Sequence, residues 1–345
     1  MIPFIDGHND VLLALHLGGE GADAFSSRPF GHLDLERARA NGFAAGFFAV
    51  FVTPENDEER AATMVPRQSA PYAQPLAGPV RLERSQGEAN AMIELLHKID
   101  GAVVARAVAD VEAALAGGPL AAILHFEGAE PIDPGLETLA GFYDRGLRSL
   151  GPVWSRPNDF AEGVAFRFPS TPDTGPGLTD AGRRLVRACN ELGILVDLAH
   201  LNERGFWDVA RVSESPLVAS HANAHALSAN SRNLPDSQLD EIGRSGGIVG
   251  ITFHAGMLGA EGGIDTELPL ERIVDHVDHV TSRIGIDHVG FGSDFDGAVV
   301  PDSVKDVTVY PRLVEALRDR GYSHDEVAKL AHGNWVRVLR ATWRD

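Results

Sequence analysis

Hydrophobic residues in this chain gather into short apolar runs that alternate with longer amphipathic stretches. Each run is nearly continuous in apolar residues, as is typical of strands buried on both faces of a parallel sheet. Eight such runs stand out: Ile2–Gly7, Ala44–Val52, Leu120–Phe126, Leu147–Val153, Ile194–Ala199, Leu217–Ser220, Ile248–Phe253 and Val289–Gly292. The pattern therefore predicts eight parallel strands.

Helical periodicity occupies much of the chain between these runs and after the last one. The predicted helices are Ser85–Ile99, Asp110–Ala116, Thr179–Leu192, Asn202–Val212, Pro235–Arg244, Leu270–Ile284, Tyr310–Arg320 and His324–Thr342. The glycine-rich turn of a dinucleotide-binding fold is missing after the first strand, which disfavours an open doubly wound sheet. Eight strands alternating with helices instead predict an α/β fold, a (β/α)8 TIM barrel of the metal-dependent hydrolase type.

The domain organisation follows from the absence of a low-complexity linker or a short repeat. We expect residues 1–345 to form a single barrel domain. Two segments, near 54–80 and 154–177, are rich in proline and polar residues. They are expected to be loop insertions that form walls or lids over the barrel mouth.

Charge and cysteine usage narrow the classes of function. The net charge of −19 argues against nucleic acid or an anionic membrane as a partner, because both require a basic face. A single cysteine, Cys189, excludes an internal disulfide framework and a cysteine-rich zinc site. No basic and apolar leader opens the sequence and no run offers the ~20 apolar residues of a membrane span, so the expected location is the cytoplasm.

Residues able to bind metals recur where the predicted strands end, which is where active sites of such barrels lie. His8 and Asp10 stand two residues apart at the end of the first run and project to the same side of an extended chain. Three later strands end in Glu127, His200 and His221, and the eighth ends in Asp294. The sequence therefore predicts a metal site assembled from several strands.

Imidazole and carboxylate ligands without thiolates suit zinc or a similar divalent ion in a catalytic role. Five ligands are too many for one tetrahedral ion that keeps a position open, so we expect two ions about 3.5–4 Å apart. Glu127 would bridge them, with His8 and Asp10 completing one shell and His200 and His221 the other. A hydroxide held between two cations is a nucleophile at neutral pH, and Asp294 would accept its proton.

Other roles stay open for these residues. His200 and His221 could be core histidines bonded to the backbone, Glu127 a structural acid, and Asp294 a further metal ligand. Three residues are expected to orient the ligands: Asp197, Asp296 and His125. Eight other histidines are expected at the surface or in packing: His16, His32, His97, His276, His279, His288, His324 and His332. The His-Glu-x-x-His and Gly-x-Ser-x-Gly motifs are absent, which argues against helical zinc peptidases and serine hydrolases.

The combination of motifs resembles the renal (membrane) dipeptidase family of binuclear zinc peptidases, which are amidohydrolase-like barrels. The matching segments span most of the chain: Asp6–Asp10, Glu127–Gly128, Asp197–His200, Ser220–His221, Ser231–Asp236 and Ser293–Gly297. The resemblance implies zinc ligation by His8, Asp10, Glu127, His200 and His221, with Glu127 bridging two Zn²⁺ ions. It also implies that Asp294 is the acid/base carboxylate and that Arg232 grips the C-terminal carboxylate of a dipeptide.

Two positions depart from the family pattern. Trp154 follows the fourth strand, where familiar members carry a histidine thought to help bind substrate, and Glu130 stands where a histidine is often found. Trp154 could supply an apolar wall for the substrate or simply pack. The family also includes homodimers.

These observations predict a metal-dependent dipeptidase that hydrolyses L,L and, by resemblance, L,D dipeptides through a hydroxide bridging two zinc ions. A first alternative is a related amidohydrolase acting on a non-peptide amide or lactam. A second is a catalytically degenerate peptide-binding barrel that kept the metal shell.

Overall fold

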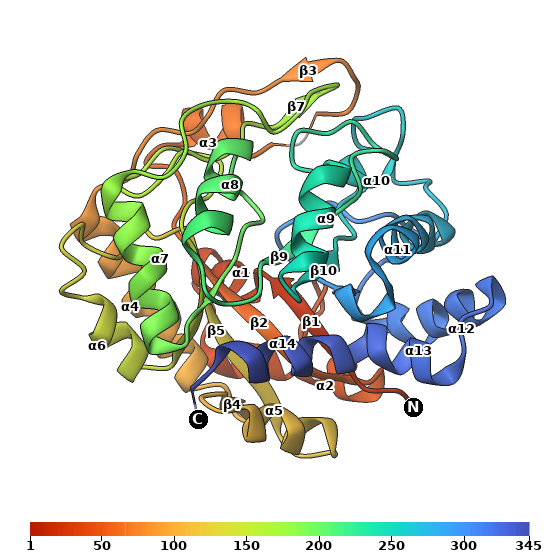
Figure 1. Cartoon of the computed structure of the whole chain (residues 1–345). Helices are drawn as coiled ribbons and strands as arrows, with labels where there is room; N and C mark the ends of the chain where they lie inside the picture. The colour runs from red at the N-terminus through yellow and green to blue at the C-terminus, as the bar shows by residue number, and fades with distance from the viewer. Residues whose placement is uncertain (66, 345) are drawn as a thin grey trace.

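The main sheet of the protein is a nearly closed parallel barrel (Figure 1). The computed structural model describes residues 1–65 and 67–344, so Pro66 and Asp345 of the predicted domain lie outside it. The barrel strands, in spatial order, are β8 (Leu195–Val196), β6 (Leu147–Gly151), β5 (Leu120–Glu127), β2 (Phe43–Phe51), β1 (Phe4–Asn9), β11 (Val289–Phe291), β10 (Ile248–Ile251) and β9 (Val218–Ala222). All eight predicted strands are present, and the predicted fold is confirmed.

Closure depends on the pairing between strands from opposite ends of the chain. β1 lies between β2 and β11, and Asp6 pairs with Phe291 in parallel register. β8 and β9 meet through a single bridge between Asp197 and Val218, which leaves the barrel just short of full closure. The ends of the strands that carry the predicted site residues therefore lie around one mouth.

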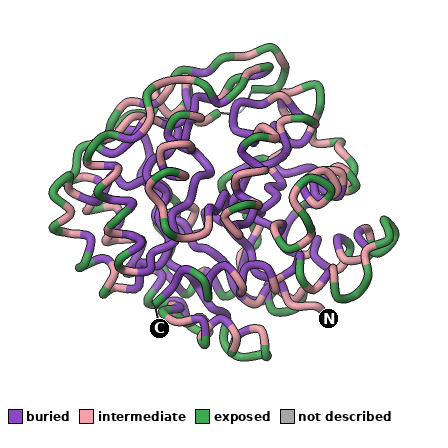
Figure 2. Tube along the Cα trace, viewed as in Figure 1, coloured by how far each residue is buried: buried purple, intermediate pink, exposed green. Residues whose placement is uncertain are grey.

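The barrel interior explains why these runs are apolar throughout. Every residue of β1, β5, β6, β8, β9, β10 and β11 is buried, and Figure 2 shows the central strands as an almost unbroken buried layer. Apolar side chains from six strands belong to one buried cluster with Trp335: Ile5, Ala45, Phe47, Ala121, Ile123, Leu195, Val218 and Ile248. Burial on both faces gives the strands no polar alternation.

Helices surround the barrel. The structure confirms α4 (Leu82–His97), α5 (Val108–Leu115), α7 (Asp180–Leu192), α8 (Glu203–Val212), α9 (Asp236–Arg244), α11 (Glu271–Ile284) and α12 (Tyr310–Arg320) within a few residues of their predicted bounds. The predicted last helix consists of α13 (His324–Ala328), a π turn (Lys329–Gly333) and α14 (Asn334–Thr342). Short helices that the sequence did not predict are α1 (Val11–Leu17), α2 (Leu35–Ala40), α3 (Asp57–Thr63), α6 (Leu139–Asp144) and α10 (Ala255–Leu258), with single 3-10 turns at Ala22–Ser26, Ile286–His288 and Val307–Val309.

α7 shows how local sequence sets these bounds. The Thr179 side chain accepts a hydrogen bond from the Gly182 amide and caps the helix. The helix ends at Gly193, whose φ of 74° is left-handed, and a Cβ there would lie 2.7 Å from the Arg344 amide. Glycine is therefore required at that position.

The two predicted loop insertions pair with each other. β3 (Tyr72–Ala73) and β7 (Arg167–Phe168) form an antiparallel pair, seen at the top of Figure 1. Within the described residues, the insertions are thus one composite flap rather than two separate loops. A further short strand, β4 (Ala102–Val104), pairs with β5 outside the barrel path. None of the described helices has the length and apolar character needed to cross a bilayer.

Candidate metal and catalytic site

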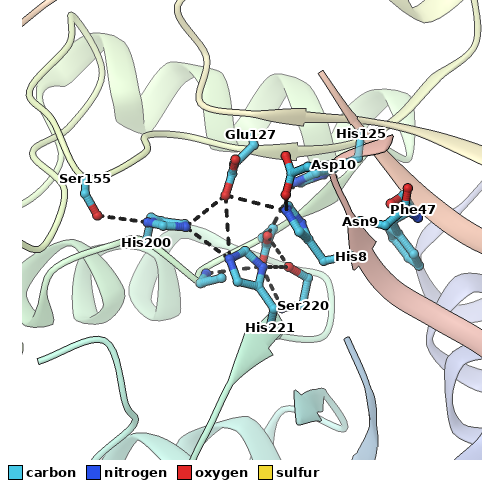
Figure 3. Close-up of polar contacts among 12 residues, drawn as sticks. His8, Asn9, Asp10, Phe47, His125, Glu127, Ser155, His200, Ser220 and His221 are labelled. Carbon is cyan, nitrogen blue, oxygen red and sulfur yellow. Dashed lines mark hydrogen bonds and ion pairs between the residues drawn. The ribbon is translucent and has the colours of Figure 1, made fainter. Parts of the chain in front are cut away.

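Three imidazoles and two carboxylates converge at the barrel mouth (Figure 3). Glu127 is central, because its Oε1 lies 2.9 Å from His200 Nε2 and 3.6 Å from both His8 Nε2 and His221 Nε2. Asp10 Oδ2 lies 3.3 Å from His8 Nε2. The structure therefore brings together all five residues that the sequence predicted as ligands.

Asp294 joins this group from the opposite end of the chain. It lies in the loop after β11 with a left-handed φ of 63°, and its backbone amide donates to the carbonyl of His8 at 3.0 Å. Oxygen and nitrogen atoms of His8, Asp10 and Asp294 lie within 4.8 Å of one another. The position next to the cluster suits either of the roles expected for Asp294, base or ligand.

Serine hydroxyls orient two of the imidazoles. His200 Nδ1 lies 3.0 Å from Ser155 Oγ, and His221 Nδ1 lies 2.8 Å from Ser220 Oγ. Because each Nδ1 is occupied, each Nε2 is left to face Glu127, and the two Nε2 atoms are 3.0 Å apart. The serine hydroxyls thus fix the orientation of both imidazole rings, with Nε2 directed toward Glu127.

Asp197 supports this arrangement from beneath. Its carboxylate accepts hydrogen bonds from the Ser220 amide at 2.8 Å and the Ser220 hydroxyl at 2.6 Å. His125 Nε2 lies 3.6 Å from the same carboxylate, and its Nδ1 lies 2.9 Å from Ser149 Oγ. Asp197 therefore acts on His221 through Ser220, which agrees with its expected orienting role.

Asp296 differs from this expectation. Its carboxylate accepts from Arg28 NH1 at 3.0 Å and from the His32 amide at 2.8 Å. It therefore fixes the loop of residues 28–32 against the barrel mouth and does not hydrogen-bond any of the five cluster residues.

Burial and neighbouring charges act in opposite directions on the pKa of His8. Burial disfavours a charged His8, but the carboxylates of Glu127 and Asp10 outweigh it and raise the pKa of His8 to about 10. Burial holds the pKa values of His200 and His221 well below the ordinary range. Neutral imidazoles keep a nitrogen lone pair available, which is the form that binds a metal.

The pKa values of the two acids Glu127 and Asp294 are raised. Burial raises the pKa of Glu127 well above its usual value, and burial with the nearby Asp10 raises the pKa of Asp294 to about 6, although His8 and Arg232 oppose the rise. Buried carboxylates are costly to ionise without a positive charge nearby, so bound cations would stabilise this group of acids.

The donor atoms fit divalent cations. Both ring nitrogens of His8 and Oδ1 of Asp10 are buried and lack any hydrogen-bond partner. Such atoms are costly to leave unsatisfied, and a metal ion bound among the carboxylates would satisfy His8 Nε2 and the Asp10 carboxylate. The set of imidazoles and carboxylates is the chemistry that zinc and similar ions prefer.

A cavity of about 200 Å³ lies beside the cluster and is lined by both predicted substrate-binding residues, Arg232 and Trp154. Arg232 is buried there, with NH2 3.0 Å from His221 Nε2 and NH1 donating to the Ala199 carbonyl, while its Nε lacks a partner. Burial lowers the pKa of Arg232 to about 10, partly offset by Asp294 and Glu127. The guanidinium therefore carries a positive charge at neutral pH.

Trp154 forms part of an aromatic wall of the same cavity. Its ring centroid lies 5.0 Å from that of Phe51 and 5.9 Å from that of Phe166. Behind it, the buried Arg156 lies 5.0 Å from the Trp154 ring, and its Nε lies 3.6 Å from Glu130 Oε1. Glu130 is therefore the partner of a buried arginine and does not reach the cavity.

Among the cavity residues that were not predicted from the sequence, His254 and Tyr72 carry side-chain donors. His254 follows β10 closely, and His221 is the penultimate residue of β9, so the strand-end rule that found the other residues applies to His254 too. Tyr72 comes from the flap strand β3 and gave no sequence signal, because only the pairing of β3 with β7 brings it to the cavity.

Fold and site together define the class: a barrel metallopeptidase of the amidohydrolase-like type. The sequence model of the membrane dipeptidase family (peptidase family M19) matches residues 1–344, and the chain belongs to this family. Membership implies dependence on metal ions and confirms the resemblance recognised from the motifs.

Solved structures agree with this assignment. The chain shares 46% identity and a TM-score of 0.93 with a metallopeptidase from Rhodobacter sphaeroides, with 99% of each chain covered, whose crystal structure holds a phosphinate mimic of the dipeptide L-Ala-D-Ala. With the probable dipeptidase PvdM from Pseudomonas aeruginosa it shares the fold, at a TM-score of 0.82 and 23% identity over 99% of this chain and 95% of that one.

Curated relatives extend the match. The dipeptidase tcpJ of Claviceps purpurea is 31% identical over 342 residues, which cover 97% of this chain and 76% of that protein. An uncharacterised protein encoded in the pqqA 5′ region of Klebsiella pneumoniae is 46% identical over 236 residues, 68% of this chain and 87% of that protein.

Proposed function

We propose that the protein hydrolyses dipeptides, both L,L and L,D, with two zinc ions held by His8, Asp10, Glu127, His200 and His221. The observation that carries the proposal is the convergence of these buried side chains on Glu127, with both His8 nitrogens unpartnered. Bound there, zinc would lower the pKa of a water molecule to about 7 and polarise the peptide carbonyl. The dipeptide mimic held by the Rhodobacter sphaeroides relative supports the substrate class.

The residues of the chain supply the remaining chemistry. Asp294 would take the proton from the attacking water and deliver it to the leaving amine, for which burial places its pKa, about 6, near neutrality. Arg232 would pair with the C-terminal carboxylate, since its charge is buried in the cavity wall. Trp154 would cover an apolar part of the substrate and exclude water.

The test combines metal analysis with kinetics of the Asp294→Asn variant. Asparagine keeps the shape but cannot accept the proton, so we expect two metal ions per chain and a kcat about 10²–10⁴-fold lower. Asp240→Asn, which removes only a surface partner of Arg283, is the matched control and should keep the wild-type rate.

The substrate panel should contain L,L and L,D dipeptides together with cyclic amides and lactams. Turnover of lactams alone would replace the dipeptidase proposal by the amidohydrolase alternative. Two bound metals with no turnover of either class would favour a peptide-binding barrel. An Asp294→Asn variant that keeps its full rate would overturn the role of Asp294.

The expected location and assembly stay predictions. Cell fractionation of the producing organism tests whether the protein lies in the cytoplasm, and sedimentation tests whether it forms a homodimer.

A further inference from the structure

A chain of hydrogen bonds runs along one wall of the cavity and connects the flap to the segment that carries Arg232. Asn230 is its centre: Nδ2 donates to Tyr72 Oη and to the Gly256 carbonyl, both at 2.9 Å. Its Oδ1 accepts from the Arg232 amide, also at 2.9 Å. The Gly256 amide in turn donates to His254 Nδ1 at 3.0 Å. All five residues line the cavity.

The partners of Asn230 fix its orientation and thereby that of the Tyr72 hydroxyl. The Gly256 carbonyl can only accept, and the Arg232 amide can only donate, so the amide group of Asn230 has one consistent orientation. Its NH2 group then meets the Tyr72 oxygen, which acts as an acceptor in that bond. The phenolic proton of Tyr72 is left free for another acceptor.

The same reasoning sets the tautomer of His254. A backbone amide can only donate, so His254 Nδ1 must be the unprotonated nitrogen. Burial, with Arg232 nearby, lowers the pKa of His254 to about 4, so the ring is neutral and its proton sits on Nε2. Among the described residues no acceptor is paired with this Nε2, and His254 lines the cavity.

The wall thus presents two neutral donors in the same cavity as a guanidinium. A carboxylate offers about four acceptor sites, and one arginine fork fills only two of them. In an enclosed site the remaining lone pairs require other donors. Three other lining residues, Phe51, Trp154 and Phe166, offer aromatic rings instead of hydrogen-bond donors.

We propose that Tyr72 and His254 are specificity residues that donate hydrogen bonds to carboxylate oxygens of the substrate's C-terminal residue, beside Arg232. The proposal rests on the proposed dipeptidase function. The oxygens belong either to the terminal carboxylate or to an acidic side chain of that residue. Because Tyr72 lies on β3, substrate recognition would also require the flap to be seated as it is in Figure 1.

The test measures binding of two non-hydrolysable probes, phosphinate analogues of Ala-Ala and Ala-Asp, to the metal-loaded protein by calorimetry. Tyr72→Phe removes only the hydroxyl. His254→Asn keeps a side-chain acceptor for the Gly256 amide at the start of α10 and removes the Nε2 donor. We expect each variant to weaken the Kd about tenfold or more, as for loss of a hydrogen bond to a charged group.

The two probes separate the two sources of oxygen. Weakening with both analogues assigns the donors to the terminal carboxylate, and weakening with Ala-Asp alone assigns them to the acidic side chain. With the corresponding dipeptides, KM should rise while kcat changes little, since the donors hold the substrate rather than the reacting atoms. Tyr143→Phe, on the distant α6, is the control and should bind both probes as the wild type does.

The proposal is overturned if both variants, folded by their melting temperature and metal-loaded, bind both probes within about twofold of wild type. It is also overturned if the wild type binds neither probe. If His254→Asn fails to fold, Tyr72→Phe decides alone. A wild type that binds the probes but cleaves no dipeptide refutes the proposed function, and the Kd values still decide the role of Tyr72 and His254.

Discussion

Some buried histidines in this molecule join two segments, and others face a candidate metal site. The hydrogen bonds of each ring show which of the two roles it has. His276 has a partner at each ring nitrogen: Nδ1 accepts from the Ala224 amide at 3.1 Å, and Nε2 donates to the Leu258 carbonyl at 3.2 Å. His8 has no hydrogen-bond partner at either nitrogen. A satisfied ring holds two segments together, whereas an unsatisfied ring among carboxylates marks a place for a cation.

The buried His276 makes the stability of the protein depend on pH. Burial lowers its pKa to about 4, whereas an unfolded histidine has a pKa of about 6.5. Between these values the unfolded chain binds the additional proton, so the free energy of unfolding falls as the pH drops from about 6.5 to 4, by up to roughly 3 kcal/mol. Urea unfolding across this range should show a shallower acid slope of the free energy of unfolding for His276→Gln than for the wild type. An identical slope in His276→Gln would contradict the prediction.

Most of the predicted site residues could be found because they lie at strand ends, whereas Arg232 follows no strand and was predicted only from the resemblance of its motif. His8, Glu127, His200 and His221 follow or end apolar runs, so the geometry of a parallel barrel brings them to one mouth. Tyr72 could not be found in this way, because its place depends on the pairing of two short flap strands without hydrophobic periodicity. The hydrogen-bond partners that set the tautomer of a ring also become visible only in three dimensions.

At the scale of elements, α14 closes the end of the barrel opposite the site. Trp335 is fully buried, and its Nε1 donates to the Phe291 carbonyl at 3.1 Å. Gly290 leaves room for the ring, since a Cβ there would lie 2.6 Å from Trp335 Nε1. The sequence predicted a helix in this region, but a helical period cannot tell whether a tryptophan fills a barrel or packs on its outside.

We therefore predict a large loss of stability for Trp335→Ala. Removing a fully buried tryptophan leaves a cavity at the base of the barrel and should lower the free energy of unfolding by about 3–5 kcal/mol. Urea denaturation with a fluorescence or circular dichroism signal measures it. Trp207→Ala, at a half-buried position on α8, is the matched control and should cost clearly less. An equal loss in the free energy of unfolding in the two variants would contradict the prediction that Trp335 fills the base of the barrel.

At the scale of the whole molecule, the site is a buried concentration of charge in an acidic protein. Cations bound to the folded chain and not to the unfolded one raise the free energy of unfolding by RT ln(1 + [L]/Kd), about 4 kcal/mol at a thousandfold excess over Kd. Removing metal with a chelator should therefore lower Tm by about 5 °C or more, and zinc should restore it. Scanning calorimetry measures the shift, and His8→Asn should show a smaller one. A Tm that changes neither when a chelator is added nor when zinc is added would contradict the presence of a metal site.

The pairing of the first and last barrel strands also sets when the site can exist. Ser293 donates to Asp6 across 287 residues of sequence, and Asp294 reaches His8 through the same junction. At ribosomal speeds of about 5–20 residues per second, the two halves are synthesised roughly 15–60 s apart. A nascent chain thus carries His8 and Asp10 long before their partner from β11 exists, and a prematurely terminated one never acquires it. The cluster of His8, Asp10 and Asp294 is in this way reserved for fully translated molecules.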